Sequence, residues 1–174
     1  FAVFGVPAET AGDVCERCRA FAVEIVEEFK YTEPNLQMTL NKIGGVEWVL
    51  DPVTMQSLVG ALVGLPNGVL AMSHAVEGLV ETSSNLASVK FGAEGIVVTT
   101  SQRSSVESAK RYAAQTVEAV LRLSGAEVAH SDGYPGWSPD PDSYLLHVTE
   151  QCYERLFAVK PKVRAIHAGL ECGL

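Results

Sequence analysis

The sequence predicts an α+β fold, an antiparallel sheet with helices on one face, followed by an incomplete α/β segment. Apolar residues recur every three or four positions over 14–29 and again over 106–121, which is typical of amphipathic helices. Two stretches with strand character, 81–91 and 95–102, are separated by a short glycine-containing turn, which is typical of a β-hairpin. The mixed order of helices and strands favours an α+β domain.

Five elements are expected before the hairpin. Residues 1–7 are apolar, β-branched and aromatic, which predicts a strand closed by proline. A long helix opens at Thr10 and ends before Pro34, and alternation over 36–40 predicts a second strand. Proline in the first turn predicts a helix over 52–64. A Pro-Asn-Gly turn then leads into a short strand that ends at Met72.

The hairpin and the helix after it give the clearest local signals. Val97 and Thr99 are expected on one face of the second hairpin strand, with Ile96, Val98 and Thr100 on the other. Residues 104–107 have the form S-x-x-E, a capping box that predicts a helix start. Its predicted buried positions are Val106, Ala109, Ala113, Val117, Val120 and Leu121. Gly125 is expected to end this helix, with one more strand over 126–129.

Composition changes at residues 133–141, which contain three prolines and two glycines. We call this stretch the connector, because such a composition is typical of an extended and stiff link. It predicts a domain boundary, with one domain over 1–133 and an incomplete second domain over 134–174. A helix is expected from the end of the connector to about Phe157, followed by a strand near 162–166.

Composition and charge restrict the function classes. The 174 residues allow one sizeable domain, alone or with part of another. A net charge of −8 argues against a nucleic-acid partner or an anionic membrane, since both require a basic face. A signal peptide and an 18-residue apolar run are both absent from the sequence, so a cytoplasmic location is expected. Cys15 and Cys18 form a C-x-x-C without a second ligand pair, and we interpret them as ordinary helix positions.

Both ends of the sequence lie inside expected elements. The first residues resemble a strand already in progress and lack an initiator methionine. The last residues end inside a cluster of glycine, glutamate, cysteine and histidine. We therefore expect the chain to be an internal fragment of a larger enzyme.

Arg103 is the strongest candidate for binding before the connector. It lies between a strand and a helix start, where free backbone N–H groups and the positive end of the helix dipole favour anions. A guanidinium suits a carboxylate because it can donate two parallel hydrogen bonds. The alternative is a solvated arginine at a strand end.

The last residues provide a second candidate group. His167 and Glu171 are four positions apart, a spacing found in metal sites, but two ligands are too few for a zinc site. Gly169 could bring a backbone N–H close to a substrate oxygen, because it has no Cβ. The alternative for all three is a packed strand-to-helix turn. We assign no metal ligand and no catalytic base in this sequence.

Four ordered motifs resemble one family, the bacterial aminoacyl-histidine (Xaa-His) dipeptidases. The motifs are Thr82–Asn85, Gln102–Ser108, Gly133–Trp137 and Ile166–Gly173. The resemblance implies a zinc metallopeptidase with two metal ions, a glutamate base and an inserted lid domain. Residues 1 to about 133 are then similar to the lid, and 134–174 to the return into the catalytic domain.

The resemblance also implies roles for individual residues. Arg103 matches the lid arginine that binds the substrate carboxylate, and Gly169 matches a glycine whose backbone faces the substrate. Glu171 and His167 match residues of the same motif without an assigned role. The family's zinc ligands and base lie outside this sequence, so we expect the fragment alone to be inactive.

Three functions remain open from the sequence. The first is a fragment of a dipeptidase that hydrolyses Xaa-His dipeptides, with the remainder of the catalytic domain and a second copy of the chain as partners. The second is a non-enzymatic α+β module for dimerisation or ligand binding, in which an unpaired strand edge binds a partner. The third is the lid of a related acylase or exopeptidase.

Overall fold

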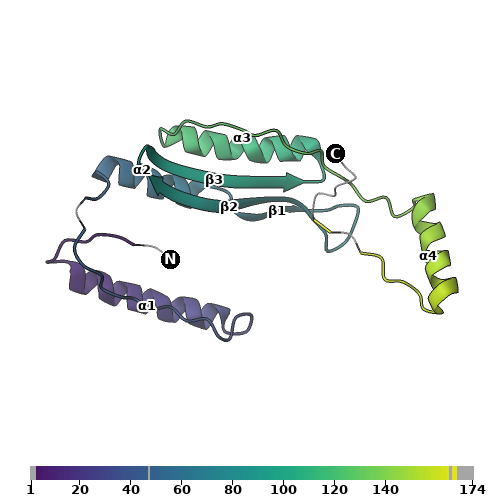
Figure 1. Ribbon diagram of the computed structural model, residues 1–174, viewed down its shortest axis with the longest axis horizontal. Helices are drawn as coiled ribbons and strands as arrows, with labels where there is room; N and C mark the ends of the chain where they lie inside the picture. Colours follow the sequence, from purple (N-terminus) through teal and green to yellow (C-terminus); the bar gives the residue numbers. More distant parts are fainter. Residues whose placement is uncertain (1–2, 47, 165, 168–174) are drawn as a thin grey trace. The chain divides into compact units, whose positions relative to one another are not determined.

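The computed structural model describes residues 3–46, 48–164 and 166–167. Over these residues the chain forms four helices and three strands, in the order α1, α2, β1, β2, β3, α3, α4 (Figure 1). The predicted α+β class is therefore confirmed. The chain divides into two compact units, Phe1–Thr54 and Met55–Leu174. None of the helices in the described ranges is long and apolar enough to cross a membrane.

The first unit is built around helix α1, Ala11–Phe29. Thr10 occupies the N-cap position, as the sequence predicts. The predicted apolar stripe is half-buried at Val14, Cys18, Ala22 and Ile25. Cys15 and Cys18 lie within the helix as free thiols, which agrees with their interpretation as ordinary helix positions.

Two strands predicted in this unit, over 1–7 and 36–40, are wrong for the residues that the structure describes there. Both stretches are extended without strand pairing. An isolated apolar run does not form a strand, because its backbone groups need hydrogen bonds from a neighbouring strand. The first stretch instead packs against the later loop. A Cβ on Gly5 would lie 2.9 Å from Val46 Cγ2 and 3.0 Å from Val49 Cγ1.

The second unit contains a three-stranded antiparallel sheet in the order β1-β2-β3. The strands are β1 (Gly68–Met72), β2 (Val80–Gly92) and β3 (Gly95–Ser104). The predicted hairpin is confirmed, with Gly92 paired to Gly95 across the turn. Its register shifts by one residue between Leu86 and Ser88, which is the signature of a β-bulge.

The two sheet faces differ in burial, as the alternation in the sequence predicts. Ile96, Val98 and Thr100 are half-buried on the face that the helices cover, whereas Val97 and Thr99 are exposed on the other face. Arg103 belongs to the exposed set, since it follows Val97 by six residues. The candidate site lies at the end of the sheet where Arg103 is located, and residues from both faces line it.

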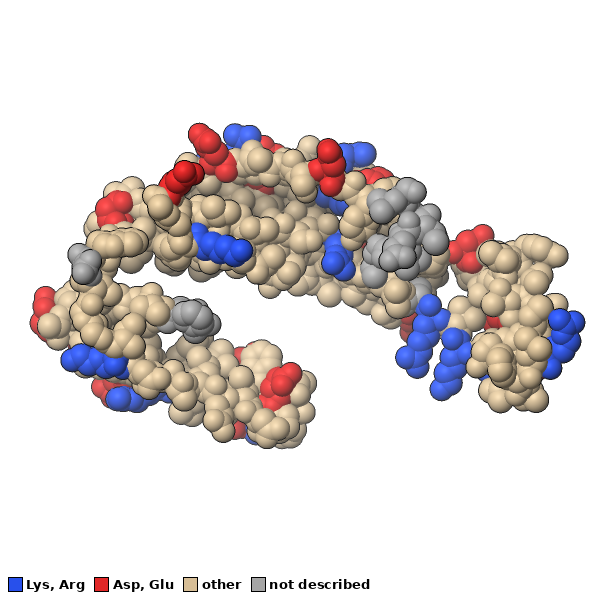
Figure 2. Space-filling model, in the orientation of Figure 1, with Lys and Arg blue, Asp and Glu red and all other residues tan. Residues whose placement is uncertain are grey.

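Helices α2 (Pro52–Gly64) and α3 (Glu107–Leu123) pack on one face of the sheet. The bounds of α2 agree with the prediction. The core cluster consists of Ala61, Leu65, Val117 and Leu121, with Leu86 and Val98 of the hairpin against it. Figure 2 shows acidic and basic side chains mixed over the outer surface of α3. This helix is therefore amphipathic, with its apolar side on the sheet.

The predicted capping box at the start of α3 is wrong. Ser104 remains in β3, so the helix begins three residues later with Val106 at the N-cap and without a side-chain cap. The Ser104 hydroxyl instead accepts a hydrogen bond from the Val106 N–H at 3.0 Å. Gly125, with φ of 85°, ends the helix as predicted. The strand predicted over 126–129 is absent from this described stretch, which is extended and unpaired.

The last helix, α4, spans Tyr144–Phe157, and Ser143 occupies its N-cap position. Its end agrees with the prediction, and its start lies a few residues later because residues 141–142 form a turn before Ser143. None of its residues is buried. The strand predicted near 162–166 does not form at the residues described there. The expected domain boundary at the connector stays a prediction.

Candidate functional site

A cavity lies in the second unit where β3 ends and α3 begins. Its lining comes from segments far apart in the sequence. They are the strand ends at 79–80 and 103–105, Lys110 of α3, connector residues 133–137 and 139, and residues 166–167. The strand-to-helix junction, the connector and the start of the last motif are separate features of the sequence. The structure brings all three together.

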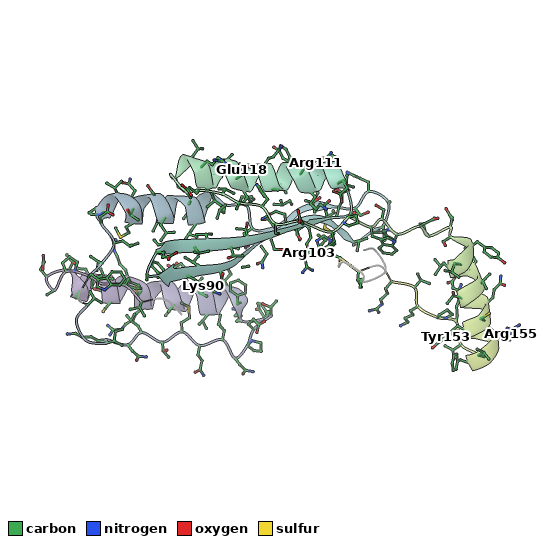
Figure 3. The ribbon with its side chains drawn as sticks, turned by 45° about the horizontal axis from the view of Figure 1, so that its top comes forward. Lys90, Arg103, Arg111, Glu118, Tyr153 and Arg155 are labelled. Carbon is green, nitrogen blue, oxygen red and sulfur yellow. The ribbon has the colours of Figure 1, made fainter. Side chains whose placement is uncertain are left out.

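Arg103 reaches this cavity from the exposed face of the sheet. Its neighbours in β3, Gln102 and Ser104, point toward the helices, and Ser104 is buried. Arg103 therefore lies on the opposite side of the sheet from α3 (Figure 3). Ser83 of β2 is its partner in the strand register.

The cavity lining is cationic. Its charged side chains are Arg103 and Lys110, and no aspartate or glutamate is among the lining residues that the structure describes. The Lys110 Nζ is occupied: it donates to Glu107 Oε1 at 2.8 Å and to the Tyr134 carbonyl at 2.7 Å. Within the described ranges, the Arg103 side chain forms no ion pair. A guanidinium in this position can bind an anionic group of a ligand through paired hydrogen bonds.

His167 joins the site through Ser83. The Ser83 Oγ and the His167 Nε2 lie 2.7 Å apart, across 84 positions of the sequence. Because Ser83 is the register partner of Arg103, this hydrogen bond places an imidazole beside the arginine. Either atom can be the donor, depending on the histidine tautomer. Gly169 and Glu171, the other candidates from this motif, lie outside the described residues.

A row of polar side chains supports Arg103 from the covered face of the sheet. Thr82, Ser84 and Ser104 are buried, and the Thr82 Oγ1 lies 2.9 Å from the Ser104 Oγ. Gln102 donates from its side chain to the Ser84 Oγ at 3.2 Å. These bonds join β2 to β3 on the covered face at the registers next to Ser83 and Arg103.

Glu107 links α3 to the connector. Its Oε1 accepts from Lys110 and also from the backbone N–H of Gly136, at 2.5 Å. The Lys110 hydrogen bond and then the Gly136 N–H lower the pKa of the Glu107 carboxyl below its usual value. The sequence predicts a helix-capping role for Glu107, contains Ser83 only as part of the Thr82–Asn85 motif, and does not single out Lys110. The contacts that bring Ser83 and Lys110 to the site span 84 and 24 positions, so no local pattern reveals them.

The described residues do not provide a metal site. Among them, no three histidine, cysteine, aspartate or glutamate side chains gather closely enough to hold an ion. Arg103, His167 and the connector can orient and bind an anionic ligand. They do not supply the ligands of a metal-activated water.

Comparison with known proteins supports the resemblance found in the motifs. The chain is 30% identical over all 174 residues to the cytosol non-specific dipeptidase of Escherichia coli (strain K12). The crystal structure of aminoacylhistidine dipeptidase from Vibrio alginolyticus matches 97% of the chain, with a TM-score of 0.86 and 32% identity. No family model matches the chain.

The similarity covers part of each relative. The chain spans 36% of the length of the Escherichia coli protein and 34% of the Vibrio alginolyticus chain. Within the matched part, the sequence is similar to both dipeptidases and the fold is similar to that of the Vibrio alginolyticus protein. The resemblance to dipeptidases that the four motifs indicate is therefore confirmed.

Proposed function

We propose that this chain is the substrate-binding lid segment of a metal-dependent dipeptidase, and that Arg103 binds the carboxylate of the dipeptide. One observation carries the proposal: the cavity contains an arginine without an ion pair among the described residues and no described carboxylate in its lining. A guanidinium in that setting selects a planar anion through two parallel hydrogen bonds. The dipeptidase relatives make a free C-terminal carboxylate the natural candidate.

In this proposal, residues 1 to about 133 form the lid and 134–174 return to the catalytic domain. Two zinc ions bound by residues outside this chain would supply an activated water, and the chain's own residues bind and orient the substrate. Closing of the lid would exclude bulk water from the peptide bond. Gly169 is also proposed as a substrate-binding residue, on the family resemblance alone. The enzyme acts in the cytoplasm, and the chain alone is inactive.

We further propose Xaa-His dipeptides such as β-alanyl-histidine as substrates. The support is the resemblance of the four motifs to the aminoacyl-histidine dipeptidases and the similarity to the Vibrio alginolyticus protein. A related acylase or exopeptidase would share the carboxylate site and differ in the side chain that it accepts. Substrate profiling of the full-length enzyme with Xaa-His, Xaa-Ala and N-acyl amino acids separates the two.

The test is hydrolysis by the full-length enzyme after chelation and after zinc is restored. Activity should disappear with the metal and return with it. Arg103→Ala should lower kcat/KM for β-alanyl-histidine by about 10- to 100-fold, the range expected for a lost charged hydrogen-bond pair. The C-terminally amidated dipeptide should be much less affected. Equal loss on both substrates would exclude the carboxylate role.

Lys90→Ala is the matched control for Arg103→Ala. Lys90 pairs with Val97, so it lies on the same sheet face as Arg103 but near the hairpin turn (Figure 3). Both substitutions remove one positive charge from that face. An equal effect of Lys90→Ala would show that general electrostatic attraction, and not a local carboxylate site, explains the loss.

A second candidate function is dimerisation through a sheet edge. Within the described part of the chain β3 pairs with β2 alone, so one edge of this ten-residue strand has no strand partner. A second copy could pair along that edge, and the dimer would be compatible with the dipeptidase. Light scattering that shows a monomer at all concentrations would exclude it.

A further inference from the structure

The connector is bound to the start of α3 at every second residue from 134 to 138. The Tyr134 carbonyl accepts from Lys110 Nζ at 2.7 Å, and the Gly136 N–H donates to Glu107 Oε1 at 2.5 Å. The Ser138 hydroxyl donates to the Ser105 carbonyl at 3.2 Å. Two of these three bonds use the charged side chains of Glu107 and Lys110.

These two side chains form more than a helix-surface ion pair. Glu107 and Lys110 are three positions apart, and such pairs alone contribute little to stability. Here each charge has a second partner on the connector, so the pair bridges two segments that are 24 to 29 positions apart. Charged partners make these hydrogen bonds stronger than neutral ones.

Gly136 allows the close approach that the bridge requires. A Cβ at this position would lie 2.7 Å from the Ser104 carbonyl oxygen and 3.0 Å from the Ser105 carbonyl carbon and oxygen. These neighbours are backbone atoms, which cannot move without shifting β3 or α3. Gly133, in the same connector, has no atom within 4 Å of its Cβ position. The two glycines therefore differ in their steric surroundings, and only Gly136 is in close contact.

We propose that Glu107 and Lys110 are positioning residues that clamp the connector through Tyr134 and Gly136, and so hold the lining of the Arg103 cavity in place. This inference rests on the proposed carboxylate role of Arg103 and adds the device that shapes its site. Tyr134 and Trp137 line the cavity from the clamped segment. Glu107 also neutralises Lys110, which leaves Arg103 as the cation that receives the substrate.

The experiment compares variants of the full-length enzyme by hydrogen exchange and by kinetics. Glu107→Ala and Gly136→Ala should speed exchange in peptides covering 133–141. Both should raise KM for β-alanyl-histidine by about tenfold or more, because a displaced cavity lining loses binding that is equal in the ground state and the transition state. Their kcat values should change less. Glu107→Gln keeps an acceptor for the Gly136 N–H but loses the negative charge beside Lys110. Its connector should therefore exchange at a rate between those of the wild type and Glu107→Ala.

Two controls isolate the clamp. Gly133→Ala tests the steric argument and should leave exchange of the connector as in the wild type. Glu118→Ala removes the same charge from the same helix, together with its contacts to Arg122 and to His130, neither of which lies in the connector. It should leave both exchange of 133–141 and KM unchanged.

The outcomes separate this inference from the proposed function. Unchanged connector exchange in Glu107→Ala and Gly136→Ala would overturn the clamp, and faster exchange with unchanged KM would overturn its positioning role. In both cases the dipeptidase proposal would still be supported if Arg103→Ala lowered kcat/KM for free-carboxylate dipeptides more than for amidated ones. If the wild-type enzyme with metal bound hydrolyses no dipeptide, the proposed function and the positioning role both fail, and exchange alone decides whether the clamp exists.

Discussion

The buried hydroxyl pair beneath Arg103 should be energetically coupled. Thr82 is 4% exposed, Ser104 is 8% exposed, and their side-chain oxygens lie 2.9 Å apart. Ser104 also accepts from the Val106 N–H, and Thr82 is placed to donate to a Glu81 carboxylate oxygen at 3.3 Å. These partners form one consistent chain in which the Ser104 hydroxyl donates to Thr82.

The expected free energies of unfolding follow from this chain of hydrogen bonds. Thr82→Val keeps the side-chain volume but leaves the Ser104 hydroxyl without its acceptor, which should cost about 1–2 kcal/mol. It also removes the donor to Glu81, but that carboxylate is only partly buried, so water can replace this bond at little cost. Ser104→Ala loses the same bond and also the acceptor for Val106, so about 2–3 kcal/mol is expected. The double variant loses the shared bond once. Its destabilisation should remain about 2–3 kcal/mol, which gives a coupling of about 1–2 kcal/mol.

Urea unfolding followed by circular dichroism at 222 nm measures all four proteins of this cycle. Thr99→Val is the control, because Thr99 is exposed on the opposite face of β3. It makes the same chemical change and should shift the free energy of unfolding by less than about 0.5 kcal/mol. If the effects of Thr82→Val and Ser104→Ala add to within about 0.3 kcal/mol, the hydrogen bond between them does not contribute as argued.

Two further predictions concern α3. Val117 is 3% exposed in the core cluster, so Val117→Ala should lower the free energy of unfolding by about 2 kcal/mol, whereas Leu123→Ala at 89% exposure should change it by less than about 0.5 kcal/mol. If urea unfolding showed the same loss of stability for Val117→Ala and Leu123→Ala, the assignment of Val117 to the core would be wrong. Arg122 and then His130 lower the pKa of the Glu118 carboxyl. Its stabilising effect should be present above about pH 4.3 and be lost as pH falls through the lowered pKa. The urea midpoints of wild type and Glu118→Gln should therefore converge between pH 6 and pH 3, and a constant difference would argue against the linkage.

The elements that the sequence predicts correctly have local causes. Pro52 and Gly64 mark the bounds of α2, and the turn between Gly92 and Gly95 produces the hairpin. The strands predicted over 1–7, 36–40 and 126–129 fail because a strand depends on a partner elsewhere in the chain. Short apolar runs provide the side chains of a strand without specifying such a partner.

The site also contains residues with a local sequence signal and residues that depend on distant parts of the chain. Arg103 could be selected as a candidate because a strand-to-helix junction is visible in the sequence. The capping-box prediction failed because Ser104 is held in β3 by Thr82, which leaves the Glu107 carboxylate to bind the connector. Ser83 and Lys110 act through distant segments, so their contributions depend on the folded structure.

The two ends of the hairpin are stabilised by different forces. Toward the turn, Leu86 and Val98 pack in the apolar core, whereas the end that carries Arg103 is joined by hydroxyl and amide hydrogen bonds. Hydrogen bonds exchange readily with water once a segment separates, and apolar burial opposes separation over the whole contact area. Local opening should therefore begin at the ligand end and stop at the core. Such a gradient would let the end of the sheet beside the cavity open while the rest of the domain keeps its structure.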